Sequence, residues 1–542
     1  MTGLEFDYII VGAGSAGCVL ADRLSRDGRH RVLVLEAGGS DNRFWIKVPL
    51  GYGFTFRDPR VTWAYMAQPD PGLDGRTAYW PRGRVVGGSS SINAMAYVRG
   101  LAQDFDDWES AGALGWGWSA VRDTYARMEQ RSGPGPGGRP CLRGDGPLRV
   151  SDLSAGMHPF SARFFDAARD MGWPVIDDMN GDAPEGLAYF ASTVKDGVRC
   201  SAADAFLKPA LKRGNVALIK DALVERLVFE GRRVTGVRYA RHGRQHVARA
   251  RAEVILSAGA INSPQLLQLS GLGPAALLRG HGIEVVQDLG QVGSGLQDHL
   301  AITFGFAATE PTLNNRLGRR WGQGLAGLRY LLSRTGPLSV PVNQVGGFVR
   351  SGGAQAVPDM QLYCNPASYS LPERGVARVD RGPGFILSAQ PCRPTSRGTV
   401  RIAAPDPTAA PEITPNSLAT EADQAQALRA CKLVRRLAET PTVAALIASP
   451  KGADVRTMSE DEMLAEFRAR AATNYHPSCT CRMGRNATDS VLDARLRVHG
   501  IAGLRVVDAS AFPNITSGNT NAPTMMLAMR AAELIVEDAR RA

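Results

Sequence analysis

One stretch of the sequence, from Asn474 to Gly484, reads NYHPSCTCRMG and gathers residue types that do chemistry. His476 stands three residues before Cys479, and Cys481 follows two residues later. This spacing is compatible with three kinds of site. It could hold a metal ion, form a redox-active thiol pair, or place a catalytic histidine above two cysteines that only pack.

The metal interpretation fails because too few ligands accompany the histidine. A structural zinc needs four ligands, which paired CxxC or HxxxH elements normally supply. Here Cys392 and Cys431 stand unpaired far upstream, so no metal site is predicted. A disulfide between residues two apart is strained, and the two cysteines of the stretch are therefore predicted to be small packing side chains. Pro477 favours an extended or turn conformation for His476, which remains the candidate base.

The N-terminus carries the pattern of a nucleotide-binding βαβ unit. A short apolar strand pattern, FDYIIV, precedes GAGSAG at residues 12–17, and a helical pattern follows. A second apolar run, RVLVL, ends at Glu36. Together these make the complete dinucleotide fingerprint of strand, glycine turn, helix and acidic residue.

Each residue of the fingerprint has its own physical reason. Gly12 permits the tight turn, Gly14 lets the backbone approach a pyrophosphate, and Gly17 lets the helix pack on the strand. The free N–H groups of the helix N-terminus bind phosphate. Glu36 is placed to accept hydrogen bonds from a ribose diol.

The fingerprint does not choose between NAD and FAD, but a second glycine-rich element favours FAD. Residues 81–93 read PRGRVVGGSSSIN, too far along the chain to belong to the first turn. Gly87 and Gly88 followed by three serines would offer backbone N–H groups and hydroxyls to a long anionic cofactor. A serine-rich surface loop is the alternative.

The chain resembles the glucose–methanol–choline (GMC) family of FAD-dependent alcohol oxidoreductases over essentially its whole length. Four ordered stretches carry the resemblance: YIIVGAGSAG with LEAG, WPRGRVVGGSSSINAMAYVRG, SAGAINSPQLLQLSGLG, and YHPSCTCRMG with VVDASAFPNITSGNTNAPTMM. The resemblance implies FAD as cofactor. Where some members anchor FAD covalently through histidine, this chain has Ile92, so non-covalent FAD is expected.

The resemblance also implies which residues meet the cofactor. They are Gly12, Gly14, Ser15, Ala16, Gly17, Glu36, Ala37, Arg84, Gly87, Gly88, Ser89, Asn93, Ala94, Met95, Ala96, Val224, Ala258, Asp508, Ala509 and Asn519.

The expected fold is α/β, or α+β overall, with a Rossmann-like FAD-binding domain that is discontinuous in sequence. That domain is predicted to comprise residues 1–155, 200–300 and 475–542. Residues 156–199 and 301–474 are predicted to form a substrate-binding domain on an antiparallel sheet with helices.

Oxidation of an alcohol by a flavin needs a base for the hydroxyl proton, while a hydride passes to flavin N5. The resemblance places the family's conserved histidine at His476. Its partner falls in the segment from Asn519 to Asn521, with Asn521 preferred and Asn519 second. His281, His299 and His499 are interpreted as structural.

The substrate is less well defined by the sequence. Trp63 and Tyr475 stand where aromatic residues could cage a quaternary ammonium, although both could be ordinary pocket walls. Choline-acting relatives carry a glutamate where this chain has Gln344, and the loss of that negative charge weakens choline as the substrate.

The sequence therefore predicts an alcohol dehydrogenase that passes electrons to a quinone or another acceptor. An oxidase that uses O₂ and a choline dehydrogenase are the alternatives. A lyase or photodecarboxylase on the same scaffold is disfavoured, because both His476 and the asparagine pair are present.

Composition excludes other classes of function. The net charge of +11 is spread along the chain, and no basic run carries the interleaved aromatic residues of a nucleic-acid platform. No run of about 18 apolar residues predicts a transmembrane span, and no signal peptide is recognised. The expected location is the cytoplasm, and peripheral association with the inner membrane face stays open.

Overall fold

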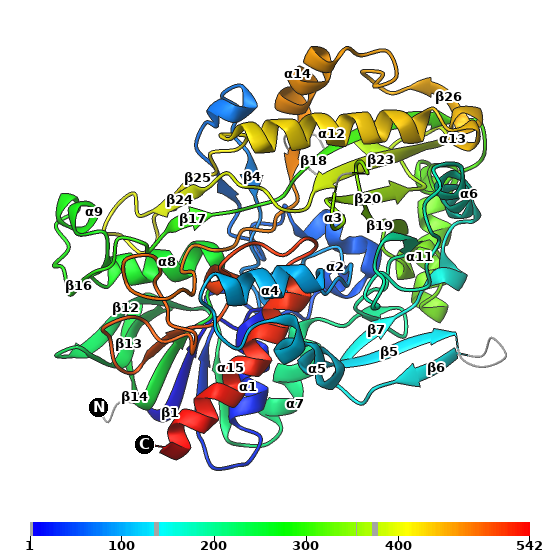
Figure 1. Ribbon diagram of the computed structural model, residues 1–542. Helices are drawn as coiled ribbons and strands as arrows, with labels where there is room; N and C mark the ends of the chain where they lie inside the picture. The colour runs from blue at the N-terminus through cyan, green and yellow to red at the C-terminus, as the bar shows by residue number, and fades with distance from the viewer. Residues whose placement is uncertain (1–3, 135–139, 354, 371–377, 542) are drawn as a thin grey trace.

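A seven-stranded sheet forms the centre of the larger half of the protein (Figure 1). The computed structural model describes residues 4–134, 140–353, 355–370 and 378–541. The strand order is β11-β2-β1-β14-β13-β12, and β28 pairs with β14. The pairs among β11, β2, β1, β14 and β28 are parallel, whereas β12 and β13 are antiparallel to their neighbours. The bounds are β1 (Leu4–Val11), β2 (Val32–Leu35), β11 (Val216–Ile219), β12 (Ala222–Glu230), β13 (Arg233–Arg241), β14 (Arg244–Leu256) and β28 (Leu504–Val506).

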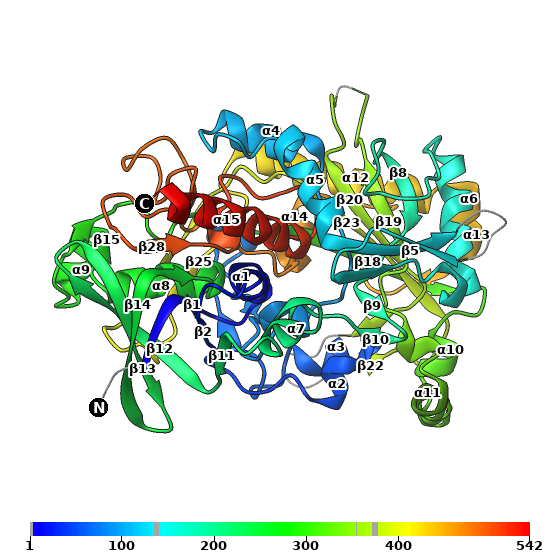
Figure 2. The same ribbon diagram turned by 90° about the horizontal axis from the view of Figure 1, so that it is seen from below.

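Two helices from opposite ends of the chain pack together beside this sheet. These are α1 (Ser15–Leu24) and α15 (Asn521–Arg541), which lie side by side in both ribbon views (Figures 1 and 2). The close packing of α1 on β1 depends on Gly17, because a Cβ there would lie 1.9 Å from the carbonyl oxygen of Gly12. Pro523 falls in the first turn of α15, where its missing N–H costs nothing.

A six-stranded antiparallel sheet builds the other half, in the order β19-β20-β23-β18-β26, with β27 pairing β18. Its strands are β18 (Leu300–Ala308), β19 (Val345–Val349), β20 (Met360–Asn365), β23 (Gly384–Pro391), β26 (Ile447–Pro450) and β27 (Ala472–Thr473). The long helix α12 (Glu421–Ala438) packs against β23. The two sheets draw on different parts of the chain, which supports our proposal of two domains with a discontinuous first one.

The other helices are α2 (Phe44–Lys47), α3 (Tyr52–Thr55), α4 (Ala102–Ser110), α5 (Trp118–Met128), α6 (Arg163–Asp170), α7 (Lys208–Leu211), α8 (Gly259–Leu269), α9 (Ala275–Gly280), α10 (Asn314–Leu317), α11 (Arg320–Ser333), α13 (Pro441–Leu446) and α14 (Glu460–Arg470). The short strands are β3 (Tyr65–Met66), β4 (Tyr79–Trp80), β5 (Glu129–Pro134), β6 (Pro140–Arg143), β7 (Leu148–Ser151), β8 (Gly186–Tyr189), β9 (Val194–Lys195), β10 (Val198–Arg199), β15 (Leu272–Gly273), β16 (Gln287–Asp288), β17 (Ser294–Leu296), β21 (Tyr369–Ser370), β22 (Arg378–Val379), β24 (Gly398–Arg401) and β25 (Glu412–Thr414).

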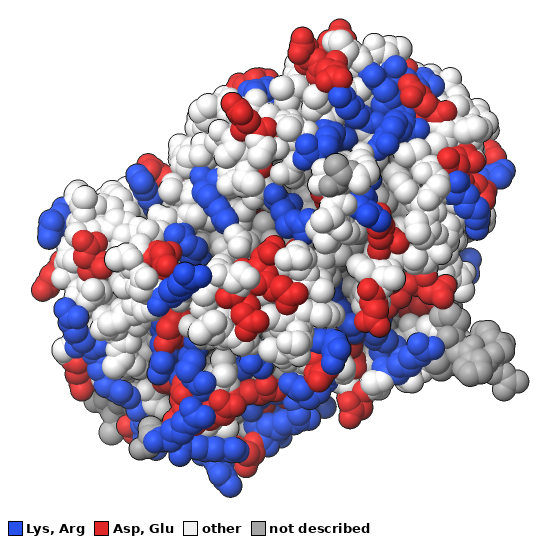
Figure 3. Space-filling model, in the orientation of Figure 1, with Lys and Arg blue, Asp and Glu red and all other residues white. Residues whose placement is uncertain are grey.

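The surface mixes both signs of charge. Figure 3 shows Lys and Arg interspersed with Asp and Glu over the face drawn there, without a large area of one sign. Among the described residues, no helix is both long and apolar enough to cross a bilayer.

Candidate active site

A cavity of about 1360 Å³ lies where the two halves meet, and both glycine-rich loops line it. The end of β1, the start of α1 and the end of β2 form one wall. Residues 474–477 and the first turn of α15 form another. A cavity outside the carboxyl ends of parallel strands is where this class of sheet binds its ligands.

The floor of the cavity is a contact between the two glycine-rich loops. A Cβ on Gly88 would lie 2.7 Å from the Cα of Gly14, and a Cβ on Gly12 would lie 2.5 Å from the carbonyl oxygen of Ser257. Gly12 also has a φ of +102°, which favours glycine. Helix α1 has no side-chain cap at its N-terminus. No capping side chain therefore accepts a hydrogen bond from its first N–H groups, which lie beside the cavity. These features fit a bound pyrophosphate.

Glu36 closes the same wall at the end of β2. Its carboxylate accepts the N–H of Ala13 at 2.9 Å and the N–H of Gly38 at 2.8 Å. Burial raises the pKa of Glu36 to about 7, against these two hydrogen bonds, which lower it. Its position fits an acceptor for ribose hydroxyls.

Most of the residues predicted to meet the cofactor line this cavity. They are Gly12, Gly14, Ser15, Ala16, Glu36, Ala37, Gly88, Ser89, Asn93, Ala94, Met95, Ala96, Val224, Ala258, Asp508, Ala509 and Asn519.

Three residues that were predicted to meet the cofactor do not line the cavity. Gly17 packs under the first loop, as described above. Gly87 has a φ of +89° and turns the second loop. Arg84 stacks its guanidinium over the ring of Trp63 at 4.7 Å.

His476 lines the cavity within a chain of three hydrogen bonds. Its Nδ1 lies 3.0 Å from Nδ1 of His299, whose Nε2 lies 2.9 Å from the carbonyl oxygen of Cys392. On its other side, Nε2 of His476 lies 3.2 Å from Nδ2 of Asn519.

The carbonyl of Cys392 determines which ring nitrogens of His299 and His476 carry a proton. A carbonyl only accepts, so His299 must carry its proton on Nε2, and its Nδ1 is then an acceptor. His476 must therefore carry its proton on Nδ1 and donate it to His299. This leaves a lone pair on Nε2 of His476, which accepts from Asn519, and that is the arrangement a general base needs.

The surroundings keep both rings neutral. Burial lowers the pKa of His476 well below its ordinary value, and the proximity of His299 and of the Arg82 guanidinium lowers it further. Burial lowers the pKa of His299 to about 4. The backbone is fixed as well, since the N–H of His476 donates to Asp298 at 2.7 Å and the preceding Tyr475 has a φ of +63°.

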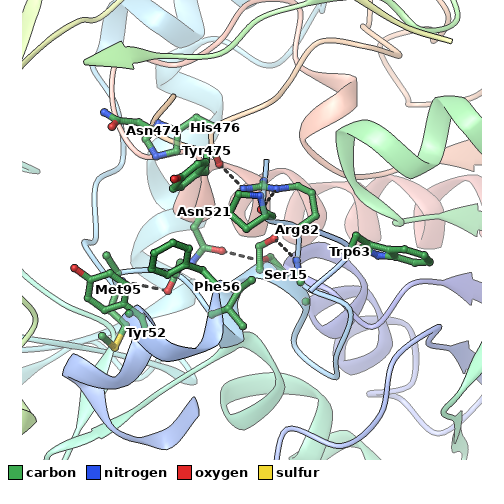
Figure 4. Close-up of a pocket in the computed structure, with 18 of the residues that line it drawn as sticks. Ser15, Tyr52, Phe56, Trp63, Arg82, Met95, Asn474, Tyr475, His476 and Asn521 are labelled. Atoms are coloured by element: carbon green, nitrogen blue, oxygen red, sulfur yellow. Dashed lines mark hydrogen bonds between the residues drawn. The ribbon is translucent and has the colours of Figure 1, made fainter. Parts of the chain in front are cut away.

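The two candidate asparagines occupy different places, and Figure 4 shows Asn521 hydrogen-bonded to Ser15. Asn519 is the one beside the His476 ring, which reverses the order of preference drawn from the sequence. Asn521 begins α15 and accepts the Ser15 hydroxyl at 2.7 Å, which ties that helix to the first glycine loop. Both residues line the cavity.

Trp63 and Tyr475 do not form a shared aromatic cage. Figure 4 shows Trp63 on the opposite side of Arg82 from Tyr475. The Trp63 ring stacks on Tyr65 at 5.9 Å and is covered by Arg84. Tyr475 instead lies 6.3 Å from the ring of Phe56, in a compartment that Tyr52 and Tyr369 also line.

Gln344 does not line the cavity, contrary to the prediction. Its side-chain oxygen accepts the N–H of His158 at 2.9 Å and the hydroxyl of Ser161 at 2.7 Å. The side chain is buried, and it holds the turn that precedes α6 rather than a substrate.

Cys479 and Cys481 are fully buried and do not line the cavity. Among the described residues, no group of histidine, cysteine and acidic side chains could hold a metal ion. The histidine of the opening stretch therefore faces the cavity, and its cysteines face the core.

Comparisons with known proteins agree with this site. Residues 6–301 and 394–528 match the family described as GMC oxidoreductase. The chain is 41% identical to an oxygen-dependent choline dehydrogenase from Vibrio vulnificus, over 98% of this chain and 94% of that one. It is 40% identical to an alcohol dehydrogenase (acceptor) from Pseudomonas putida, over 98% of this chain and 96% of that one.

Solved structures show the same fold over the whole chain. A pyridoxine 4-oxidase from Mesorbium loti superposes with a TM-score of 0.85 at 30% identity, covering 97% of this chain and 98% of that one. A formate oxidase from Aspergillus oryzae, whose FAD modification is described, superposes with a TM-score of 0.91 at 26% identity and covers all of both chains.

This chain belongs to the GMC oxidoreductase family. It is a flavoprotein enzyme that oxidises an alcohol, and the predicted fold class and FAD cofactor are confirmed. FAD, when bound, takes up the hydride of the alcohol at its N5 atom. The glycine floor, the free end of α1 and Glu36 are the parts of this chain that fit its dinucleotide portion.

Proposed function

We propose that His476 is the general base of alcohol oxidation and that Asn519 holds the substrate oxygen beside it. The observation that carries this proposal is the hydrogen-bond chain from His476 through His299 to the carbonyl of Cys392, which leaves Nε2 of His476 as the acceptor. The alcohol oxygen would sit between Nε2 of His476 and Nδ2 of Asn519, donating its proton to the first and accepting from the second. The carbinol carbon is then directed towards the rest of the cavity.

The substrate that fits best is a neutral alcohol with an apolar chain. Among the described lining residues the only carboxylates are Glu36 and Asp508, and both lie at ends of the nucleotide-binding sheet. The compartment of Tyr52, Phe56 and Tyr475 therefore has aromatic walls without a counter-charge for a cation. Arginines also line the cavity, which further opposes a quaternary ammonium: Arg82, Arg320, Arg378 and Arg381.

Choline is the second candidate. The aromatic walls are the kind that receive an ammonium through cation–π contacts. Several relatives are named choline dehydrogenase, including the one from Vibrio vulnificus. For the electron acceptor we propose a quinone, with O₂ as the alternative. The binding of FAD is proposed to be non-covalent, because Ile92 stands where some members carry the anchoring histidine, and no histidine or cysteine of that loop lines the cavity.

An anaerobic titration of the oxidised holoenzyme tests the proposal. We expect primary alcohols with apolar chains to bleach the flavin absorbance, and choline at the same concentration to leave it largely oxidised. Reoxidation with a quinone is expected to be faster than with air, and acid precipitation is expected to release the FAD. Bleaching by choline alone would replace the neutral alcohol with choline, and no bleaching by any alcohol would overturn the proposal.

The two asparagines are expected to separate by kinetics. Replacing Asn519 by Ala removes the donor beside His476, and we expect kcat/KM to fall by about 10- to 100-fold with the FAD content unchanged. Replacing Asn521 by Ala removes the acceptor of the Ser15 hydroxyl, and the main effect should be weaker FAD retention. Stopped-flow reduction and the FAD-to-protein ratio measure the two effects, and the reverse pattern would restore Asn521 as the substrate-binding residue.

A further inference from the structure

Helix α11 exposes a continuous stripe of large apolar side chains. Trp321, Leu325, Leu328 and Leu332 have exposed fractions of 61, 60, 55 and 79%. They stand at positions i, i+4, i+7 and i+11, so they share one face of the helix. Single exposed leucines need no explanation, but a contiguous apolar stripe marks a surface that binds something.

The other faces of α11 pack against the protein or line the cavity. One faces the protein, through Gly322, Ala326 and Tyr330, which are buried. Another lines the active-site cavity, through Arg320, Gln323, Gly327 and Leu331. The helix is therefore part of the cavity wall, and its exposed apolar stripe lies outside that wall.

Helices α2 and α3 add a second apolar lip to the same opening. Phe44, Trp45 and Phe54 are each 40 to 47% exposed and also line the cavity. The rings of Trp45 and Phe54 stack at 4.2 Å. Leu50 and Tyr52, between them in sequence, pack on the apolar cluster that contains Ala326 of α11. Figure 2 shows α11 projecting at the edge of the molecule on the side where α2 and α3 lie.

The charged residues on α11 and on the segments that flank it in sequence are all arginines. The sequence contains no acidic residue between Glu310 and Asp359. Six arginines of that stretch are exposed. Arg350 pairs with Glu185, whereas within the described part of the chain the other five form no ion pair with a carboxylate: Arg316, Arg319, Arg320, Arg329 and Arg334. An apolar helix face flanked by arginines is the composition of helices that lie in the interface of an anionic bilayer.

We propose that α11, with the lip formed by α2 and α3, docks the protein on an anionic lipid bilayer. Since these elements surround the mouth of the cavity, an apolar alcohol dissolved in the bilayer reaches the site without crossing water; this second step rests on the proposed function. A second copy of the chain fits the surface less well, because a symmetric contact would bring the unpaired arginines of both copies together.

Vesicle co-sedimentation of the holoenzyme tests the docking. We expect it to sediment with vesicles of phosphatidylcholine and phosphatidylglycerol, and much less with phosphatidylcholine alone. The double variant Leu328→Glu/Leu332→Glu should bind the anionic vesicles about tenfold or more weakly. Leu114→Glu is the matched control, because Leu114 is 73% exposed in the loop between α4 and α5, away from the stripe.

Measurements of turnover test docking on vesicles separately from catalysis. Leu328 and Leu332 do not line the cavity, so turnover of a short water-soluble alcohol should be unchanged in the double variant. Turnover of a long-chain alcohol supplied in anionic vesicles should fall. If binding depends on the stripe but no alcohol reduces the flavin, the docking stands and the proposed function fails.

Two outcomes overturn the docking itself. One is equal sedimentation of the wild type and the double variant, or no sedimentation of either. The other is a wild-type dimer in analytical ultracentrifugation that the double variant converts to monomers, which would assign the stripe to self-association.

Discussion

Replacing His476 by Ala should lower kcat/KM for the alcohol by about 10²- to 10⁴-fold, the range that one positioned general base contributes. The hydroxyl proton would then have to leave without the positioned base. The FAD content should stay at the wild-type level, because the contacts that fit the dinucleotide come from the glycine loops and Glu36. Stopped-flow reduction of the flavin under anaerobic conditions measures the loss directly.

The pH dependence of kcat/KM is a second test of His476 as the base. Burial and the proximity of His299 and Arg82 lower the pKa of His476, so the base is unprotonated at neutral pH. The wild-type kcat/KM should therefore be flat through neutral pH and fall only well below pH 6.5, as the ring takes up a proton. The His476→Ala variant should lack this acid limb, whereas a His281→Ala control should keep both the rate and the limb. A His476→Ala variant with the wild-type rate and profile would contradict the assignment.

The sequence was sufficient for the parts of the site that follow from local pattern. The GAGSAG turn and the apolar runs around it predict β1, α1 and β2, because a glycine turn between a buried strand and a helix leaves little freedom. His476 could likewise be singled out, since Pro477 and the family motif mark it. These features need only a few consecutive residues.

The parts that the sequence missed depend on contacts between distant segments. His299 was interpreted as structural, yet it touches His476 from 177 residues away. The sequence alone did not show that Asn519, and not Asn521, lies beside the His476 ring, because a difference of two positions before a helix decides which side chain turns towards it. Gln344 was assigned to the pocket from a motif comparison, but in the structure it precedes β19 and its side chain points towards Ser161. No local pattern shows which way such side chains point.

The second prediction concerns His299, which we propose as a positioning residue for the base. Its neutral Nδ1 holds the proton of His476 on the far side of the ring, and the carbonyl of Cys392 fixes that state. Replacing His299 by Leu removes the acceptor, so the His476 proton is free to move to Nε2 and occupy the lone pair that must accept from the alcohol. A base locked in the wrong tautomer can lose up to about 10⁴-fold in rate, and we expect about 10- to 100-fold here because both tautomers would interconvert.

The readout that separates positioning from mere packing is the tautomer itself. In protein labelled with ¹⁵N-histidine, the ring shifts of His476 should report a proton on Nδ1 in the wild type and a mixture in His299→Leu. His299→Asn places an amide oxygen near the lost Nδ1 and should recover part of the rate, although it gives up the contact with Cys392. KM and FAD content should change little in either variant, because His299 itself is buried behind the base and does not line the cavity. If His299→Leu loses activity while the His476 proton stays on Nδ1, then His299 acts through packing alone, and the tautomer argument for the base must be given up with it.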